Sequence, residues 1–70
     1  MRLSVKEARD RLEWSQVTAA RKLGVSEPTY RKYEQQPEEM RLKTAVALAR
    51  VLRVKFTDLK LYDEDSTDPR

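Results

Sequence analysis

The chain has 70 residues, with 15 Lys and Arg side chains against 12 Asp and Glu, and therefore a net charge of +3 at pH 7. It has no cysteine and no histidine, which excludes disulfides, thiolate metal sites and histidine general bases. No stretch approaches the roughly 18 apolar residues of a membrane span, and the N-terminus lacks the apolar core of a signal peptide. We therefore expect one small, soluble, cytoplasmic domain without a cofactor.

The charge is unevenly distributed along the chain. Residues 1–62 carry 14 basic and 8 acidic side chains, a net charge of +6, whereas residues 63–70 carry 4 acidic and 1 basic side chain. A basic body suits an anionic partner, most commonly nucleic acid, although other basic proteins share this balance. The pattern predicts a folded domain over residues 1–62 and an acidic, disordered tail over residues 63–70.

The first predicted helix lies in "SVKEARDRLEW". Ser4 precedes it and Glu7 follows three residues later, which is the spacing of a capping box. Val5, Ala8 and Leu12 then recur at intervals of three and four residues, which is typical of one buried helical face.

A second and a third helix follow closely. Ser15 precedes "QVTAARKL", and Gly24 ends that helix because glycine readily adopts the left-handed conformation of a helix C-terminus. Ser26 then caps "EPTYRKYEQ", where Pro28 falls in the first turn and removes an N–H that has no partner within the helix. Two helices joined by such a short glycine turn predict a helix-turn-helix.

The rest of the chain is also predicted to be helical. Apolar residues recur at helical spacing in "LKTAVALARVL", but two starting points are open. Pro37, Glu38 and Glu39 carry the signals of an early helix start; alternatively "QPEE" is a loop and the helix begins near Arg41. Thr57 is predicted to cap a last short helical turn in "DLKLY".

The two faces of the predicted third helix differ in chemistry. At roughly 100° per residue, Tyr30 and Tyr33 share one face. The opposite face gathers Pro28, Arg31, Lys32 and Gln35. Such a helix fits a DNA major groove, where Arg and Lys donate to guanine O6 and N7 and Glu accepts from cytosine N4. The alternative interpretation is a charged face that is merely solvated.

These residues together resemble the helix-turn-helix domains of lambdoid-phage repressors and Cro proteins, also called the xenobiotic-response-element family. The resemblance covers about residues 5–59 and rests on "VKEAR", "SQVTAARKLGVS", "YRKYE" and "LKTAVALARVLRV". It implies an all-α fold, a compact lambda-repressor-like bundle of five helices, within residues 1–62. It also implies double-stranded operator DNA as the partner, usually a palindrome bound by a homodimer.

The resemblance also implies roles for single residues. The implied base contacts of the third helix are Glu27, Pro28, Lys32 and Arg31. The implied phosphate contacts are Gln16, Thr29, Arg41 and Lys43. Arg9 and Glu34 match a largely buried ion pair between the first and third helices. Because Pro28 has no N–H to donate, it offers a base only apolar contact, for instance to a thymine methyl group.

Some positions depart from the family pattern. Gln36 replaces a glycine, which leaves the course of the next loop open, and Arg53 stands where glycine or asparagine usually ends the fourth helix. Tyr30 and Tyr33 replace aliphatic residues, while alanines replace larger residues in the first two helices. We hypothesise an exchange of volume, in which the tyrosine rings fill the space and their hydroxyls reach the surface.

The predicted function is sequence-specific transcriptional regulation by a phage-type repressor or Cro-like protein that occludes promoter DNA. The protein is expected in the cytoplasm, associated with the nucleoid. The alternatives are a restriction-modification controller, an antitoxin with a small toxin partner, and a protein-binding adapter that has lost DNA binding. An enzyme is not expected, because only scattered carboxylates and lysines remain for acid–base chemistry. Val51, Leu61 and Tyr62 are a candidate dimer patch, although ordinary burial explains them equally well.

Overall fold

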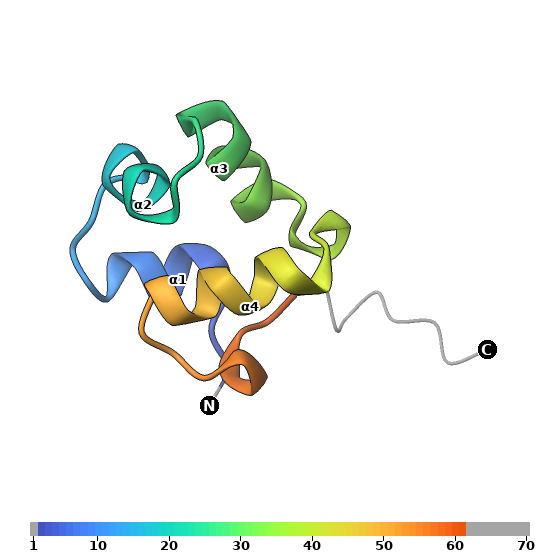
Figure 1. The fold of residues 1–70 in the computed structure, drawn as a ribbon. Helices are drawn as coiled ribbons and strands as arrows, with labels where there is room; N and C mark the ends of the chain where they lie inside the picture. Colours follow the sequence, from blue (N-terminus) through green and yellow to red (C-terminus); the bar gives the residue numbers. More distant parts are fainter. Residues whose placement is uncertain (1, 62–70) are drawn as a thin grey trace.

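The computed structural model describes residues 2–61, and within them the chain is almost entirely helical. Its α-helices are α1 (Val5–Asp10), α2 (Gln16–Leu23), α3 (Glu27–Gln35) and α4 (Leu42–Val51), and its 3-10 helices are η1 (Pro37–Glu39) and η2 (Phe56–Asp58). Helices α2 and α3 lie on one side of α1 and α4, and η2 lies on the other (Figure 1). The prediction of a helical bundle with a helix-turn-helix is confirmed, but four α-helices are present in the described chain instead of five.

The expected fifth helix is replaced by a single 3-10 turn followed by extended chain. Thr57 lies inside that turn and caps no helix. Leu59 then pairs with Leu3 in an isolated parallel bridge. The Leu3 N–H donates to the Asp58 carbonyl over 2.8 Å, and the Lys60 N–H donates to the Leu3 carbonyl over 2.6 Å. Backbone groups that a helix would pair internally are paired between the two ends of the domain instead.

The predicted start of each of the first three helices is confirmed. Ser4 accepts a hydrogen bond from the Glu7 N–H over 3.0 Å, and the Glu7 carboxylate accepts one from the Ser4 N–H over 2.8 Å, which completes a capping box. Ser15 and Ser26 likewise accept from the N–H three residues on. Each serine satisfies a donor that the first helical turn leaves unpaired.

Gly24 ends α2 in the left-handed conformation, with φ of 86°. The Val25 N–H donates to the Ala20 carbonyl over 3.0 Å, as in a Schellman turn. No atom lies within 4 Å of a Cβ placed on Gly24, so its conformation and not a lack of space favours glycine here. Pro28 is the second residue of α3, as the sequence predicts.

The open question about the start of α4 is resolved in favour of a late start. Pro37–Glu39 forms the separate helix η1, and α4 begins after Arg41, which provides no side-chain cap. Gln36 has φ of −135° and ψ of 61°, outside the left-handed region, so the loop follows a course that a residue with a Cβ accepts. The substitution of the family's glycine is therefore explained.

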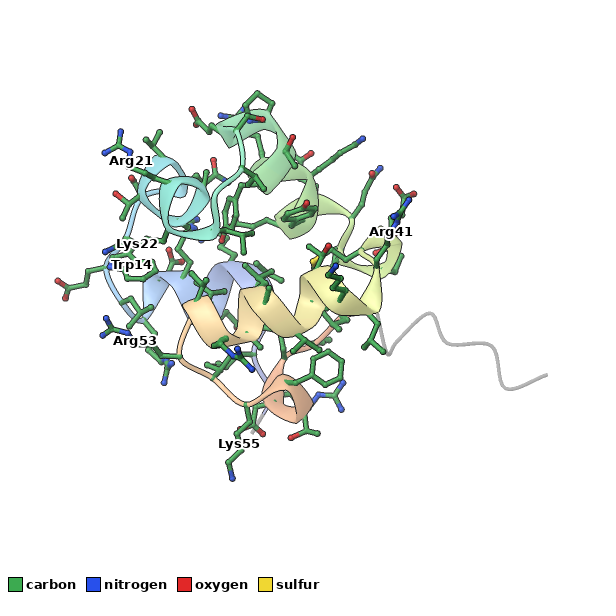
Figure 2. All side chains as sticks on the ribbon, viewed as in Figure 1. Trp14, Arg21, Lys22, Arg41, Arg53 and Lys55 are labelled. Atoms are coloured by element: carbon green, nitrogen blue, oxygen red, sulfur yellow. The ribbon has the colours of Figure 1, made fainter. Side chains whose placement is uncertain are left out.

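Arg53 and Glu13 adopt left-handed conformations, with φ of 62° and 61°. Arg53 thus keeps the conformation that glycine usually has at this position, at a cost of about 1–2 kcal/mol. Its carbonyl accepts a hydrogen bond from Arg11 Nη2 over 3.2 Å. Its guanidinium lies 5.9 Å from the ring centroid of Trp14, and Lys22 Nζ lies 5.5 Å from the same centroid (Figure 2). Trp14 packs against the core, which indicates a structural role.

Within residues 2–61, half of the buried apolar residues of the core are alanines, and Tyr30 is the one aromatic ring among these buried residues. The buried apolar residues are Val5, Ala8, Ala19, Ala20, Tyr30, Ala45, Leu48, Ala49, Leu52 and Leu59. Tyr30 is 0% exposed and meets the Tyr33 ring edge to face, with centroids 6.4 Å apart. A large ring among alanines agrees with the hypothesis that the tyrosine rings fill the space that smaller side chains leave. The expectation that both hydroxyls reach the surface is wrong for Tyr30, whose hydroxyl is buried and makes no hydrogen bond.

Tyr30→Phe should therefore raise the free energy of unfolding, by about 1 kcal/mol, because a buried unpaired hydroxyl carries a desolvation penalty of that order. Burial and the nearby Glu34 carboxylate both raise the pKa of Tyr30, so the phenol is neutral at physiological pH. Urea unfolding of the wild type and the variant would measure the difference. Tyr33→Phe, at a half-buried ring, is the matched control and should leave stability unchanged. A clear loss of stability in Tyr30→Phe alone would show that the hydroxyl has a favourable partner.

Candidate nucleic-acid interface

The outer face of α3 is open to solvent over its whole length. Tyr30 points into the core, while Pro28, Arg31 and Lys32 are exposed and Glu27 is partly exposed. Helix α3 lies at the edge of the molecule, joined to α2 by the short turn (Figure 1). The stripe that the sequence assigns to DNA therefore remains available to a partner.

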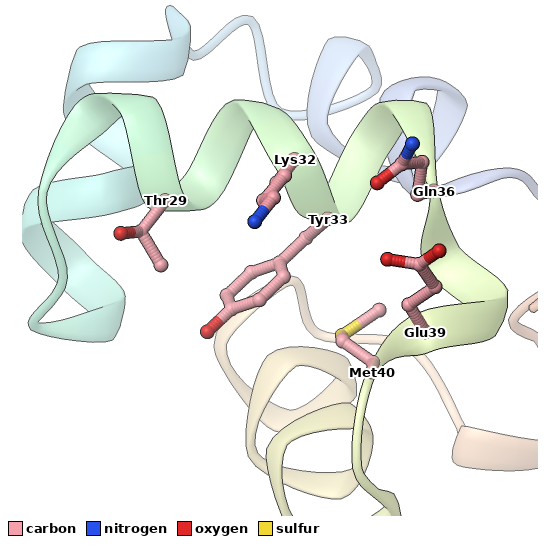
Figure 3. A pocket seen from close by; sticks show the side chains of 6 residues that line it. All are labelled: Thr29, Lys32, Tyr33, Gln36, Glu39 and Met40. Carbon is pink, nitrogen blue, oxygen red and sulfur yellow. The ribbon is translucent and has the colours of Figure 1, made fainter.

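A cleft of about 230 Å³ runs along the second half of α3. It is lined by Thr29, Lys32, Tyr33, Gln36, Glu39 and Met40, whose side chains converge on it from α3 and from the segment that follows (Figure 3). Sequence reasoning missed Gln36, although its spacing of four residues from Lys32 indicates the same helical face. It also missed Glu39 and Met40, whose positions depend on the course of the loop and have no local signal.

A second cleft, of about 360 Å³, lies where α4 begins. Arg41 and Lys43, both exposed, stand at its edge, and Leu23 and Val25 contribute apolar surface. Tyr33 lines both clefts. The predicted phosphate contacts of α4 and the stripe on α3 are therefore parts of one continuous surface.

Behind this surface lies the ion pair that the resemblance implies. Arg9 Nε donates to Glu34 Oε2 over 2.5 Å, and its Nη2 donates to Glu34 Oε1 over 3.3 Å. Arg9 Nη1 also donates to the Trp14 carbonyl over 2.7 Å. The side chains of Arg9 and Glu34 are only 9% and 6% exposed, so the pair fastens α3 to α1 inside the protein.

The environment of Glu34 keeps it ionised. Burial by itself raises the pKa of this carboxyl group, but Arg9, the neighbouring Tyr30 hydroxyl and Gln16 together outweigh that effect. Its pKa therefore lies below the ordinary value for glutamate. At neutral pH the pair is fully charged.

Gln16 connects the buried pair with the outer face of α3. Its amide Nε2 donates to Glu34 Oε1 over 2.9 Å, and its amide oxygen accepts from Arg31 Nε over 3.3 Å. Arg31 Nη2 in turn donates to Glu27 Oε2 over 2.6 Å. Since an amide nitrogen has two N–H groups, Gln16 keeps one donor for a ligand such as a phosphate. The sequence analysis did not predict the Glu27–Arg31 contact, although the two residues are four positions apart on one helix.

A protein-family model described as helix-turn-helix matches residues 5–59, which span all four α-helices. The chain belongs to this family. The match confirms the resemblance to the xenobiotic-response-element type of domain. Searches of curated proteins and of solved structures found no match.

This helix-turn-helix protein is a DNA-binding regulator of the xenobiotic-response-element type. Domains of this family bind DNA in regulation and are not catalytic, which agrees with the expectation that the chain is not an enzyme. Among residues 2–61, no helix has the length and apolar character needed to cross a bilayer.

Two predictions concern surfaces outside the helix-turn-helix unit. Of the candidate dimer patch, Val51 and Leu61 are half-buried, and Leu61 packs against the core. Tyr62 and the acidic tail predicted over residues 63–70 lie outside the described residues. Among residues 2–61, the exposed large apolar side chains are instead Leu42 (68% exposed) and Val46 (38% exposed) on α4 and Val17 (43% exposed) on α2.

Proposed function

We propose that this helix-turn-helix protein is a sequence-specific transcriptional repressor of the phage or Cro-like kind. It binds double-stranded operator DNA by placing α3 in the major groove and represses by covering a promoter. The operator is a palindrome, and the protein binds it as a homodimer. The observation that supports this proposal is the open basic stripe on α3, continuous with Arg41 and Lys43 at the start of α4.

The proposal assigns separate roles to residues of this surface and to the ion pair behind it. Lys32 contacts a base edge, and Pro28 gives apolar contact with a thymine methyl group. The phosphate contacts are Gln16, Thr29, Arg41 and Lys43. Arg9 and Glu34 hold α3 at the correct angle from behind. Contacts to phosphates place the protein on the duplex, while contacts to bases select the sequence.

Selection of bound sequences from random duplex DNA tests the proposal directly. Enrichment of one palindrome would support a dimeric, sequence-specific regulator, and the spacing of its half-sites would give the dimer geometry. If no duplex is enriched and no duplex binds, the proposed function is wrong.

The roles of Lys32 and Lys43 lead to different expected outcomes for their alanine variants. Lys43→Ala should weaken binding to all duplexes alike, because a phosphate contact carries no sequence information. Lys32→Ala should also relax the preference at one base pair, by about 1–3 kcal/mol of discrimination. Titration of each variant with the selected operator and its single-base-pair variants would measure both effects. Lys55→Ala, on the side of the molecule away from α3 (Figure 2), is the control. Identical losses in the two variants would contradict the assigned roles.

The antitoxin alternative receives support from one observation, the exposed apolar pair Leu42 and Val46 on α4. Two such side chains one helical turn apart form a small surface for a protein partner. Copurification of a small toxin with the tagged protein from its native cell would favour this alternative. The DNA-binding surface would be the same in both cases.

A further inference from the structure

Arg31 is held in a fixed position on the outer face of α3. Exposed arginine side chains usually populate many rotamers. Here Nη2 donates to Glu27 over 2.6 Å and Nε donates to Gln16 over 3.3 Å, although the side chain is 45% exposed. Gln16 is itself held by the buried Glu34. The orientation of the guanidinium is therefore set by the protein before any ligand arrives.

The donors that Arg31 leaves unused form a specific pattern. A guanidinium has five N–H donors in one plane, and Glu27 and Gln16 take two of them, on Nη2 and Nε. Within residues 2–61, Nη1 of Arg31 has no hydrogen-bond partner. Nη1 therefore keeps both of its N–H groups and Nη2 keeps one, so that a donor on each of these two nitrogens remains for a ligand. Two parallel donors are what the O6 and N7 atoms of a guanine accept.

Glu27, unlike Arg31, is poorly suited to contact a base. Its Oε2 atom accepts the short charge-assisted hydrogen bond from Arg31, so the carboxylate already has a cationic partner. To accept a hydrogen bond from cytosine N4 in the way the sequence suggests, it would have to share or give up that partner. A carboxylate near DNA phosphates is also unfavourable unless a cation neutralises it.

We propose that Arg31 recognises a guanine through its Nη1–Nη2 edge, and that Glu27 and Gln16 are positioning residues that hold it there. Glu27 contacts no base in this arrangement. This inference rests on the proposed function and names the residue that sets base preference at the N-terminal half of α3. Gln16 has a second role in the proposal, because the amide N–H that Glu34 does not use remains able to donate to a phosphate.

The test is a comparison of base preferences among variants of Glu27 and Arg31. The operator obtained by selection, each of its single-base-pair variants and a random duplex are titrated with wild type, Arg31→Ala and Glu27→Ala. Arg31→Ala should lose discrimination at one G·C pair, by roughly 5- to 150-fold, which corresponds to 1–3 kcal/mol. Glu27→Ala should lose discrimination at that same pair. Its affinity for the random duplex should be unchanged or higher, because a negative charge has been removed.

Two further variants separate positioning from a structural effect. Glu27→Gln keeps an oxygen that accepts from Arg31 and should restore much of the discrimination. The double variant Glu27→Ala/Arg31→Ala should be no less discriminating than Arg31→Ala alone, because both act through one contact. All variants should unfold at nearly the wild-type temperature, since an exposed ion pair contributes little to stability.

Particular results would overturn the inference. If Glu27→Ala changes the preference at a different base pair from Arg31→Ala, Glu27 contacts a base itself. If Arg31→Ala leaves every preference intact, Arg31 is not the specificity residue, although the proposed function survives. If wild type shows no preference among duplexes, the proposed function fails first and this inference fails with it.

Discussion

Replacing Arg9 with methionine should lower the free energy of unfolding by about 3–5 kcal/mol, because the change leaves a buried carboxylate without its cation. Glu34 is only 6% exposed and takes two hydrogen bonds from Arg9. The variant also loses the bond from Arg9 to the Trp14 carbonyl. Domains of this kind have total stabilities of about 5–15 kcal/mol, so much of the fold's stability is at stake. Urea unfolding at pH 7, followed by the fluorescence of Trp14, would measure the loss.

The exposed pair between Lys6 and Asp10 provides a matched control on the same helix. Its atoms are 2.8 Å apart, but its side chains are 66% and 51% exposed. Lys6→Met should therefore change stability by less than about 0.5 kcal/mol. Adding Glu34→Gln to Arg9→Met should recover part of the loss, because the buried group is then neutral. If the Arg9 and Lys6 variants lose equally little, the buried pair is unimportant.

The same pair gives the wild-type protein a predictable response to acid. The pKa of Glu34 is lowered in the folded state. Its contribution to stability is therefore complete above the pKa of an unfolded glutamate, about 4.3. That contribution is lost as the pH falls through the lower folded-state pKa. The Arg9→Met/Glu34→Gln variant should lose less stability over this range than the wild type does.

Neutralising the proposed DNA surface should abolish operator binding. The variant replaces four residues with glutamine: Arg31, Lys32, Arg41 and Lys43. Losing two base contacts and two phosphate contacts should weaken binding by about 10³-fold or more. The dependence of log K on log salt should become shallower by about 4 for the proposed homodimer, because each protomer loses two phosphate contacts and each contact contributes about 0.9 to the slope. Titrations of the operator at several salt concentrations would measure both quantities.

A variant with the same net charge but an intact α3 surface is the decisive control. Lys22 and Arg53 lie over the ring of Trp14, Arg21 lies on the same side of the molecule, and Lys55 lies below them, all away from Arg41 (Figure 2). Replacing these four residues with glutamine removes the same number of charges. It should leave the operator preference intact. If the two variants lose binding equally, net charge and not the α3 surface determines binding, and the roles proposed for the residues of α3 are wrong.

The helices could be predicted because their signals are local. Ser4 with Glu7, Ser15, Gly24 and Ser26 each act on backbone groups within a few residues, so the sequence alone indicates where α1, α2 and α3 begin or end. The prediction of a last helical turn capped by Thr57 was wrong, because the conformation of that segment depends on a distant partner. Leu59 finds backbone partners around Leu3, 56 positions earlier, and no local pattern reveals that pairing.

The positions of the site residues on α3 could be predicted from the sequence, but the contacts between their side chains could not. Helical spacing placed Pro28, Arg31 and Lys32 on the outer face of α3, where the structure has them exposed. Which donors meet which acceptors depends on side-chain rotamers, and the hydrogen bonds of Arg31 with Glu27 and Gln16 were not predicted. The hydroxyl of Tyr30 was misplaced for a related reason, because helical spacing gives the direction of a ring but not the depth of the pocket that receives it.

The pairing of Leu3 with Leu59 has a practical consequence for experiments on this protein. It brings the first and last described segments together near η2, at the far side of the molecule from α3 (Figure 1). A tether or label joined ahead of Leu3 will therefore leave the outer face of α3 unobstructed on a sensor surface.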